Sequence, residues 1–335
     1  MNNSEKPVND KILIIADSRI GTYQQSIALA EAIGFDYELL EVNYNYFSKL
    51  PNFFLQFYPA HLDNSSSKKI KNYLANSKFS PKFIISSGRR TASIALWIKK
   101  FFYKTKIIQI MQPEINYQKF DLVILPIHDK IKYKKTDNLV STLGAMNRIN
   151  DQLILNEQKK FSDFFDKINK KIIVLLIGGK TKDNFYNPIS IKNFCQRVST
   201  IVNNFNCYLI ILNSPRTSLE INEIIKNNLT CDNVFFDYET IKDNNPYLAS
   251  LGYGDFFIAM GDSVSMISQC CSTGKPVFIF DDKKISSSKH RIFHEQLYSQ
   301  NYALPFDEKI DLNNIFPANK LQEAKRISSL ISSKF

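Results

Sequence analysis

Ten short apolar runs recur along this chain, and segments of helical character separate them. The runs lie at 11–17, 37–42, 82–87, 106–111, 122–126, 171–178, 207–213, 233–237, 255–260 and 276–280. A run that is apolar at nearly every position is typical of a strand buried on both faces, as in a parallel sheet covered by helices. The alternation therefore predicts an α/β fold built on parallel sheets.

The series of runs occurs twice, which predicts two domains. A length of 335 residues favours two domains, and a hydrophobic content of 44% lets each domain bury its own core. A polar, helix-like stretch at 156–171 separates the two series. We expect Rossmann-like domains at 1–155 and 170–320, followed by an amphipathic C-terminal helix at 321–335.

The formal net charge of +11, from 43 Lys and Arg against 32 Asp and Glu, suits an anionic partner. The positive charges are spread out, so we expect no nucleic-acid binding. A general bias toward Lys, Asn and Ile would produce the same charge without any partner. The five cysteines lack metal-ligand or CxxC spacing and indicate reduced thiols. We expect a cytoplasmic protein without a bound metal, and keep peripheral contact with the inner face of a membrane as an alternative.

The segment 256–280 indicates a binding site for an anion. It has the pattern of a buried strand, a tight turn at Gly261, a short helix that Asp262 and Ser263 can cap, and a second strand. A helix that starts at the carboxyl edge of a parallel sheet offers free N–H groups to a phosphate, and the Ser265 hydroxyl could add a hydrogen bond. An ordinary capped βαβ unit would have the same pattern.

Other glycines also follow predicted strands, among them Gly21, Gly178 and Gly179. Ligands of open α/β sheets bind at this edge, where glycine lets the backbone approach them closely. The repetition suggests a cleft lined by both domains, although turns after strands also use glycine for geometry alone. The first glycine loop is not GxGxxG, so NAD is not expected, and we predict no cofactor besides a nucleotide substrate.

Several segments, taken in order, resemble one family over nearly the whole chain. They are ADSRIGTYQQSIALAEAIG (16–34), SSGRRTASIA (86–95), FDLVILPIHD (120–129), LLIGGKTK (175–182) and NPYLASLGYGDFFIAMGDSVSMISQCCSTGKPV (245–277). They resemble the mitochondrial-fission Elm-type family, whose bacterial members are labelled predicted nucleoside-diphosphate-sugar epimerases. The resemblance implies a GT-B-like outline, in which two Rossmann-like domains flank a nucleotide-sugar cleft.

The resemblance implies roles for residues of the C-terminal domain. The GDSVS turn at 261–265 would cradle a diphosphate, and Lys180, in the loop after Gly178 and Gly179, would face the sugar and the acceptor. Arg216 would contact a phosphate. Gln269 stands where GT-B enzymes often carry a ribose-binding Glu, so a hydrogen bond would remain but its charge-assisted part would be lost.

Four residues of the N-terminal domain are further candidates. Asp17 closes the first predicted strand and would act as a general base toward an acceptor hydroxyl, or as a helix cap. His128 follows another strand and is a second candidate base, or part of a hydrogen-bonded loop. Arg89 and Arg90 begin a helix, where cations oppose the helix dipole, so an anionic ligand would explain their position.

The segment 44–62 carries seven aromatic residues and no acidic residue. With the basic segment 97–106 it could form a membrane-contact surface, which predicts a lipid-linked or membrane-surface acceptor. The favoured interpretation is that these aromatic side chains pack between helices and sheet.

The sequence thus predicts a GT-B-like protein that binds a nucleotide sugar and transfers the sugar to an acceptor without a metal. A nucleoside-diphosphate-sugar epimerase is one alternative, although it needs more acid and base groups than the sequence identifies. A non-catalytic binding or scaffold module, of the kind that the fission role of eukaryotic relatives implies, is another.

Overall fold

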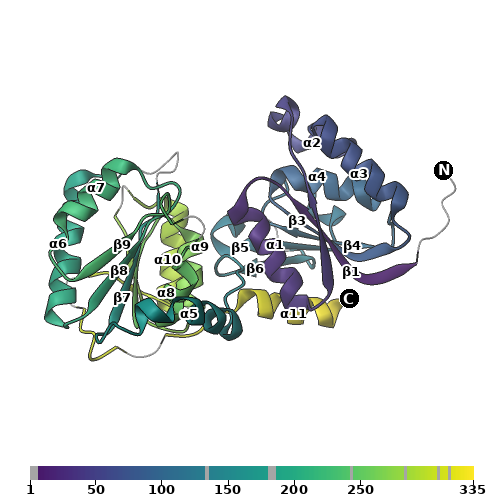
Figure 1. Cartoon of the computed structure of the whole chain (residues 1–335). Coiled ribbons are helices and arrows are strands. Elements are labelled where there is room, and N and C mark those ends of the chain that lie inside the picture. Colours follow the sequence, from purple (N-terminus) through teal and green to yellow (C-terminus); the bar gives the residue numbers. More distant parts are fainter. Residues whose placement is uncertain are drawn as a thin grey trace. The chain divides into compact units, whose positions relative to one another are not determined.

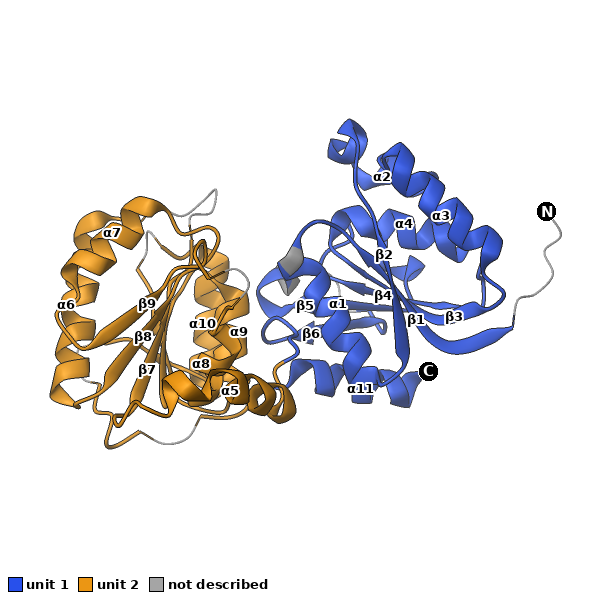
Figure 2. Cartoon of the chain, in the orientation of Figure 1, with its two compact units in different colours: residues 1–148, 322–335 blue, residues 149–321 orange. Residues whose placement is uncertain are grey.

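The computed structural model describes residues 7–132, 136–179, 186–241, 244–282, 285–307, 310–315 and 318–335. The chain forms two compact units, Met1–Arg148 with Gln322–Phe335, and Ile149–Leu321 (Figure 2). Each unit contains a six-stranded sheet whose strand pairs are parallel. The predicted fold class, α/β with two parallel sheets, is confirmed.

The sheet of the first unit has the order β2-β1-β3-β4-β5-β6 (Figure 1). Its strands are β1 (Val8–Ala16), β2 (Asp36–Glu41), β3 (Ser80–Ser87), β4 (Lys106–Ile110), β5 (Leu122–Pro126) and β6 (Leu139–Thr142). The helices are α1 (Ile20–Ile33), α2 (Asn52–Leu55), α3 (Asn64–Asn76), α4 (Arg89–Lys99) and α11 (Glu323–Lys334), with 3-10 turns η1 (Tyr46–Lys49), η2 (Tyr117–Lys119) and η3 (Ile127–Lys132). β6 was not predicted, because LVST is too short and too polar to form an apolar run.

Helices cover both faces of this sheet. Ile70 of α3 and Ile98 of α4 are buried with the side chains of one face. Leu29 of α1 and Ile327 of α11 are buried with those of the other face, and Ser328 donates a hydrogen bond to the carbonyl of Ala32 at 2.7 Å. The last helix of the chain is therefore part of the first unit's core.

The sheet of the second unit has the order β12-β11-β10-β7-β8-β9. Its strands are β7 (Ile172–Leu176), β8 (Tyr208–Leu212), β9 (Asn233–Phe236), β10 (Phe256–Met260), β11 (Val277–Phe280) and β12 (Leu304–Pro305). The helices are α5 (Asp151–Phe165), α6 (Pro188–Asn204), α7 (Leu219–Asn228), α8 (Tyr247–Tyr253), α9 (Val264–Cys271) and α10 (Ser288–Ser299). β12 was not predicted, because two residues carry no periodicity.

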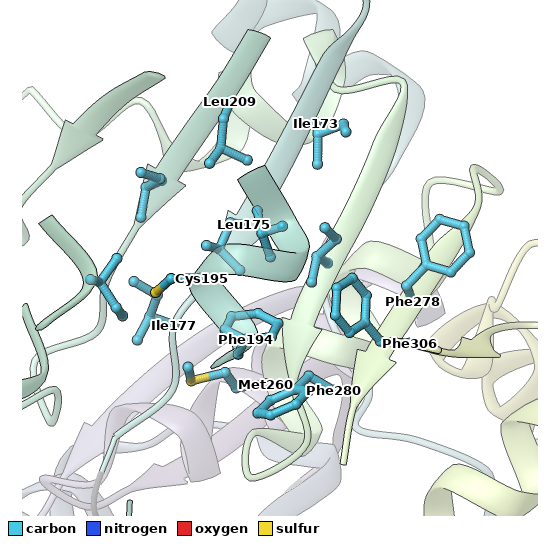
Figure 3. Packing of buried hydrophobic residues seen from close by; sticks show 14 of the residues in the cluster. Ile173, Leu175, Ile177, Phe194, Cys195, Leu209, Met260, Phe278, Phe280 and Phe306 are labelled. Carbon is cyan, nitrogen blue, oxygen red and sulfur yellow. The ribbon is translucent and has the colours of Figure 1, made fainter. Parts of the chain in front are cut away.

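Aromatic side chains fill the core beside α6. The rings of Phe194 and Phe280 stack at 4.2 Å between centroids, and Phe306 meets Phe194 edge-on at 5.2 Å (Figure 3). The stretch expected to be a connector is α5, which packs on α8. Its Phe165 ring stacks on Tyr253 at 4.5 Å, so the stretch is a structural part of the second unit.

The structure corrects one interpretation of the aromatic segment 44–62. Its side chains were expected to pack between helices and sheet, but six of the seven aromatic residues are more than half exposed, from 52% for Phe47 to 80% for Tyr46. Tyr44 is the exception. In the described part of the chain, no helix is both long and apolar enough to cross a bilayer.

Candidate functional site

The candidate site of the second unit lies where the strand order of its sheet reverses. From β7 the chain proceeds to β8 and β9 on one side, and then returns to β10 on the other side of β7. Loops at the carboxyl ends of two such strands diverge and leave room for a ligand. The loop after β7 contains Gly178 and Gly179, and the loop after β10 contains Gly261 and Asp262.

Asp262 fills the space between these two loops. Its side chain is buried, and Oδ2 accepts a hydrogen bond from the Gly179 N–H at 2.9 Å. A Cβ at position 178 would lie 2.1 Å from Oδ1 of Asp262, well inside van der Waals contact. Glycine is therefore required at 178 to admit this carboxyl group. The Gly179 N–H is already occupied and cannot also bind an anion.

The Tyr186 hydroxyl lies close to this carboxyl group. Neither Oδ1 of Asp262 nor the Tyr186 hydroxyl makes a hydrogen bond of good geometry with a described residue, yet each group shifts the pKa of the other. Burial raises the pKa of Asp262 above its ordinary value, against the lowering effects of the nearby Tyr186 hydroxyl, the Gly179 N–H and Arg216.

The first turn of α9 offers the clearest anion-binding geometry. Ser263 caps the helix, because its Oγ accepts a hydrogen bond from the Met266 N–H at 3.4 Å and its carbonyl accepts one from Ile267. The N–H groups of Val264 and Ser265 precede the first intrahelical bond and have no acceptor among the described residues. Both residues are partly exposed, so the positive end of the helix is accessible.

Arg216 lies beside the same edge, in the loop after β8. A Cβ at Gly179 would lie 2.3 Å from the carbonyl carbon of Arg216, so the two backbones are in close contact. Thr217 holds this arrangement by donating a hydrogen bond to the Gly178 carbonyl at 2.6 Å. The Arg216 side chain is exposed and forms no ion pair with any described residue, so its guanidinium is available to an anion. Lys180, predicted to face the sugar, lies outside the described residues.

Gln269 lies on the second turn of α9, and the oxygen of its side-chain amide is engaged in a hydrogen bond. Its Oε1 accepts a hydrogen bond from the Tyr247 hydroxyl at 2.5 Å. Burial raises the pKa of Tyr247 well above its ordinary value, which keeps the phenol protonated as a donor. The Nε2 group of Gln269 remains as the donor that could reach a ribose hydroxyl.

Gly261 is required by close packing on the other side of the turn. A Cβ there would lie 2.6 Å from Oγ of Ser286 and 2.8 Å from Cε1 of His294. His294 is buried, and its Nδ1 lies 3.3 Å from Oδ2 of Asp281, directly after β11. No local pattern predicts this pair, because the two residues lie on different elements at a spacing typical of no motif. Tyr186 and Tyr247 were missed for the same reason.

In the first unit, Asp17 is tied to Arg19. Its side chain is 1% exposed, and Oδ2 accepts hydrogen bonds from Nη2 of Arg19 at 2.7 Å and from Nε at 2.9 Å. Gly88, at φ +79°, would place a Cβ 3.2 Å from the same Nη2 atom. The guanidinium thus lies next to the start of α4. Gly21 has open space around it, so close packing does not require glycine there.

The two adjacent arginines of α4 have different surroundings. Arg89 donates hydrogen bonds to the carbonyls of Ser48 at 2.8 Å and Leu50 at 2.9 Å, so it holds the chain around η1. Arg90 lies over the ring of Tyr44, with Cζ 4.9 Å from its centroid. The first turn of α4 has no side-chain cap, and the guanidinium groups of Arg90 and Arg19 place two cations near it.

The structure does not bring Asp17 and His128 together. Asp17 follows β1, and His128 lies in η3 directly after β5. β3 and β4 run between these strands, so β1 and β5 lie about 14 Å apart at the usual strand spacing. The two residues are therefore alternative candidates for one base rather than a pair. No group of three or more His, Cys, Asp or Glu side chains that could hold a metal occurs among the described residues.

A solved structure supports the fold assignment. A ugt transferase from Siraitia grosvenorii, crystallised in complex with UDP, is similar over 98% of this chain and 94% of the transferase chain, with a TM-score of 0.51 and 8% sequence identity. At that identity the likeness concerns the fold alone. The fold is GT-B-like.

Sequence relatives identify the family. An uncharacterized protein of Rickettsia prowazekii (strain Madrid E) is 34% identical over 348 residues, covering 96% of this chain and 97% of that protein. The Mitochondrial fission protein ELM1 of Arabidopsis thaliana is 28% identical over 223 residues, covering 60% of this chain and 52% of that protein. The family described as Mitochondrial fission ELM1 matches residues 20–335. The chain therefore belongs to the mitochondrial fission ELM1 family.

Proposed function

We propose that the second unit binds a nucleoside-diphosphate sugar, with the diphosphate on the first turn of α9. The observation that carries the proposal is the pair of accessible N–H groups, on Val264 and Ser265, at the reversal point of the sheet. A helix start in this position favours phosphate. Arg216 adds an exposed cation on one side, and Nε2 of Gln269 adds a donor for the ribose.

The proposed reaction is metal-independent glycosyl transfer. The bond between the sugar C1 and the diphosphate oxygen breaks, a bond from the acceptor oxygen to C1 forms, and a base takes the acceptor's proton. The α9 N–H groups and Arg216 would stabilise the charge that develops on the departing diphosphate. The candidate bases are His128 and Asp17. The carboxylate of Asp17 accepts hydrogen bonds from Arg19.

A second candidate function is nucleotide-sugar binding without turnover. The engaged carboxylate of Asp17 favours it, and so does Gln269, which cannot contribute the charge of a glutamate. An epimerase is a third outcome, and would require acid and base groups around the sugar. The unpaired state of the five cysteines fits a reducing compartment such as the cytoplasm.

The binding proposal is tested by Ser265→Glu. A carboxylate at the second helical position interacts favourably with the helix dipole, so the variant should remain folded while it repels a diphosphate. The matched control is Ser65→Glu, since Ser65 is exposed and holds the second position of α3. We expect UDP, GDP or CDP to raise the melting temperature of the wild type and of Ser65→Glu, but not of Ser265→Glu.

The outcome of incubation with nucleotide sugars separates the candidate functions. Release of the diphosphate with a new glycoside supports transfer, and inversion at a sugar carbon without release supports epimerisation. Binding without either product supports the non-catalytic module. Failure of every nucleoside diphosphate to shift the melting temperature of the wild type would overturn the proposal.

A further inference from the structure

The first unit carries an unusually large exposed aromatic surface. Of the 18 large hydrophobic side chains that are exposed in the described part of the chain, seven lie between residues 46 and 58, and Phe101 and Tyr103 bring the number to nine. We call these nine side chains, eight aromatic residues and Leu50, the aromatic face. At about 200 Å² for a fully exposed aromatic side chain, they expose about 1,000 Å². The largest apolar patch of a typical monomer covers about 300–600 Å².

The chain that carries the aromatic face is firmly anchored. The buried Asn52 of α2 donates hydrogen bonds to the carbonyls of Arg89 and Pro113, both at 2.6 Å. Arg89 binds the carbonyls of Ser48 and Leu50, and Lys100 binds that of Phe57 at 3.1 Å. Figure 1 shows α2 farther from the sheet than α4. The fold therefore fixes this backbone while its aromatic side chains point to solvent.

Ring contacts join the two parts of the face. Tyr58 packs edge-on against Trp97 at 6.2 Å, and Trp97 packs against Phe101 at 5.6 Å. Trp97 thereby links Tyr58, three residues after α2, to Phe101, two residues after α4. Phe53 and Phe54 of α2 also meet edge-on, at 5.4 Å.

Positive charge surrounds this surface. The ammonium groups of Lys49, Lys119 and Lys104 lie 5.1 Å, 5.8 Å and 5.9 Å from the ring centroids of Tyr46, Phe57 and Tyr103, respectively. The stretches 43–62 and 89–113 contain no aspartate or glutamate, and Glu114, which follows them, lies 3.6 Å from Nε of Arg89. A partner must therefore accept aromatic side chains and supply negative charge around them.

We propose that the aromatic face docks on a bilayer surface that contains anionic phospholipids. The aromatic rings would enter the boundary between headgroups and acyl chains, and the lysines would contact lipid phosphates. A second copy of this chain fits the face less well, because it would bring the same lysines together. The inference concerns the first unit and does not depend on nucleotide binding by the second.

Flotation of the full chain with vesicles tests the proposal. We expect binding to vesicles that mix phosphatidylcholine with phosphatidylglycerol, weaker binding as salt screens the lysines, and little binding to phosphatidylcholine alone. Lys49→Glu should weaken the binding by more than about tenfold, since each lysine near an anionic surface contributes about 1 kcal/mol, and reversal also adds repulsion. The matched control Lys325→Glu, on the exposed face of α11, should bind more tightly than Lys49→Glu and close to the wild type.

A second variant tests the aromatic contribution. The triple change Phe53→Ser, Phe54→Ser and Phe57→Ser should reduce binding on the order of a hundredfold, because binding scales with the apolar area that enters the membrane. The control, Ile189→Ser with Leu219→Ser, removes side chains that are 69% and 76% exposed in the second unit, and should bind normally. Circular dichroism is used to check that each variant is folded.

Three results would overturn the inference. The wild type could fail to float with anionic vesicles at low salt, or the triple variant could bind as well as the wild type. Alternatively, the triple change could abolish a concentration-dependent dimer in a wild type that binds no vesicles, which would assign the face to self-association. Nucleotide-induced melting shifts are measured separately, so each proposal can fail without the other.

Discussion

The contact between Gly178 and Asp262 makes a quantitative prediction. Gly178→Ala places a methyl group 2.1 Å from Oδ1 of Asp262, and the backbone angle φ at 178 lies outside the left-handed region, so the clash is the main cost. The carboxyl group must move, which strains the packing by about 1–3 kcal/mol. It also loses the hydrogen bond from Gly179, worth about 1–3 kcal/mol. We expect the free energy of unfolding of the second unit to fall by about 2–6 kcal/mol.

The assay can follow the two units separately. Trp97, the single tryptophan, lies in α4 of the first unit, so its fluorescence reports unfolding of that unit alone. Urea unfolding followed by far-ultraviolet circular dichroism reports both units. The Gly178→Ala variant should lower the midpoint of the circular-dichroism transition that belongs to the second unit. The Trp97 transition should stay in place.

A double-mutant cycle identifies the cause. In the background Asp262→Ala, no carboxyl group remains to clash, so Gly178→Ala should cost at least about 1 kcal/mol less than in the wild type. Gly21→Ala is the matched control, because a Cβ there meets no atom within 4 Å. In the helix α1 it should stabilise the first unit by about 0.5–1 kcal/mol. An equal cost of Gly178→Ala in both backgrounds would refute the reasoning.

Two further predictions concern Asp262 in the second unit and Arg89 in the first unit. Because burial raises the pKa of Asp262 in the folded state, its contribution to stability is complete below the unfolded pKa near 3.8 and is lost as the pH rises through the folded value. Asp262→Asn should therefore reduce the loss of second-unit stability between acid and neutral pH; an unchanged pH profile from urea unfolding would contradict this. In the first unit, Arg89→Met should release the chain around Ser48 and Leu50, and so speed proteolysis between residues 46 and 58. Arg90→Met removes only a contact with the ring of Tyr44 and should not speed this proteolysis. Equal cleavage of both variants would argue against the anchoring role of Arg89.

The fold could be predicted from the sequence because buried parallel strands leave a local signal. FFIAM, for example, is apolar at every position and forms β10. The partners of Asp262 could not be predicted in this way, because its contact with Gly178 depends on β10 lying beside β7, and the order of strands is not written in any local pattern. The exposure of Phe53 and Phe57 was mistaken for burial for a related reason. Composition shows that a segment is aromatic, but only the anchoring bonds of Asn52 and Arg89 show which way it faces.

The position of α11 has a consequence for the order in which the protein folds on the ribosome. The second unit is one continuous stretch of chain, whereas the first combines residues that precede it with residues that follow it. Ile327 and Ile331 complete a core that begins at β1, and they are synthesised after the whole of the second unit. The first unit to be translated is therefore the last to be completed, and β1 to β6 must wait with one face of their sheet partly uncovered while the second unit folds.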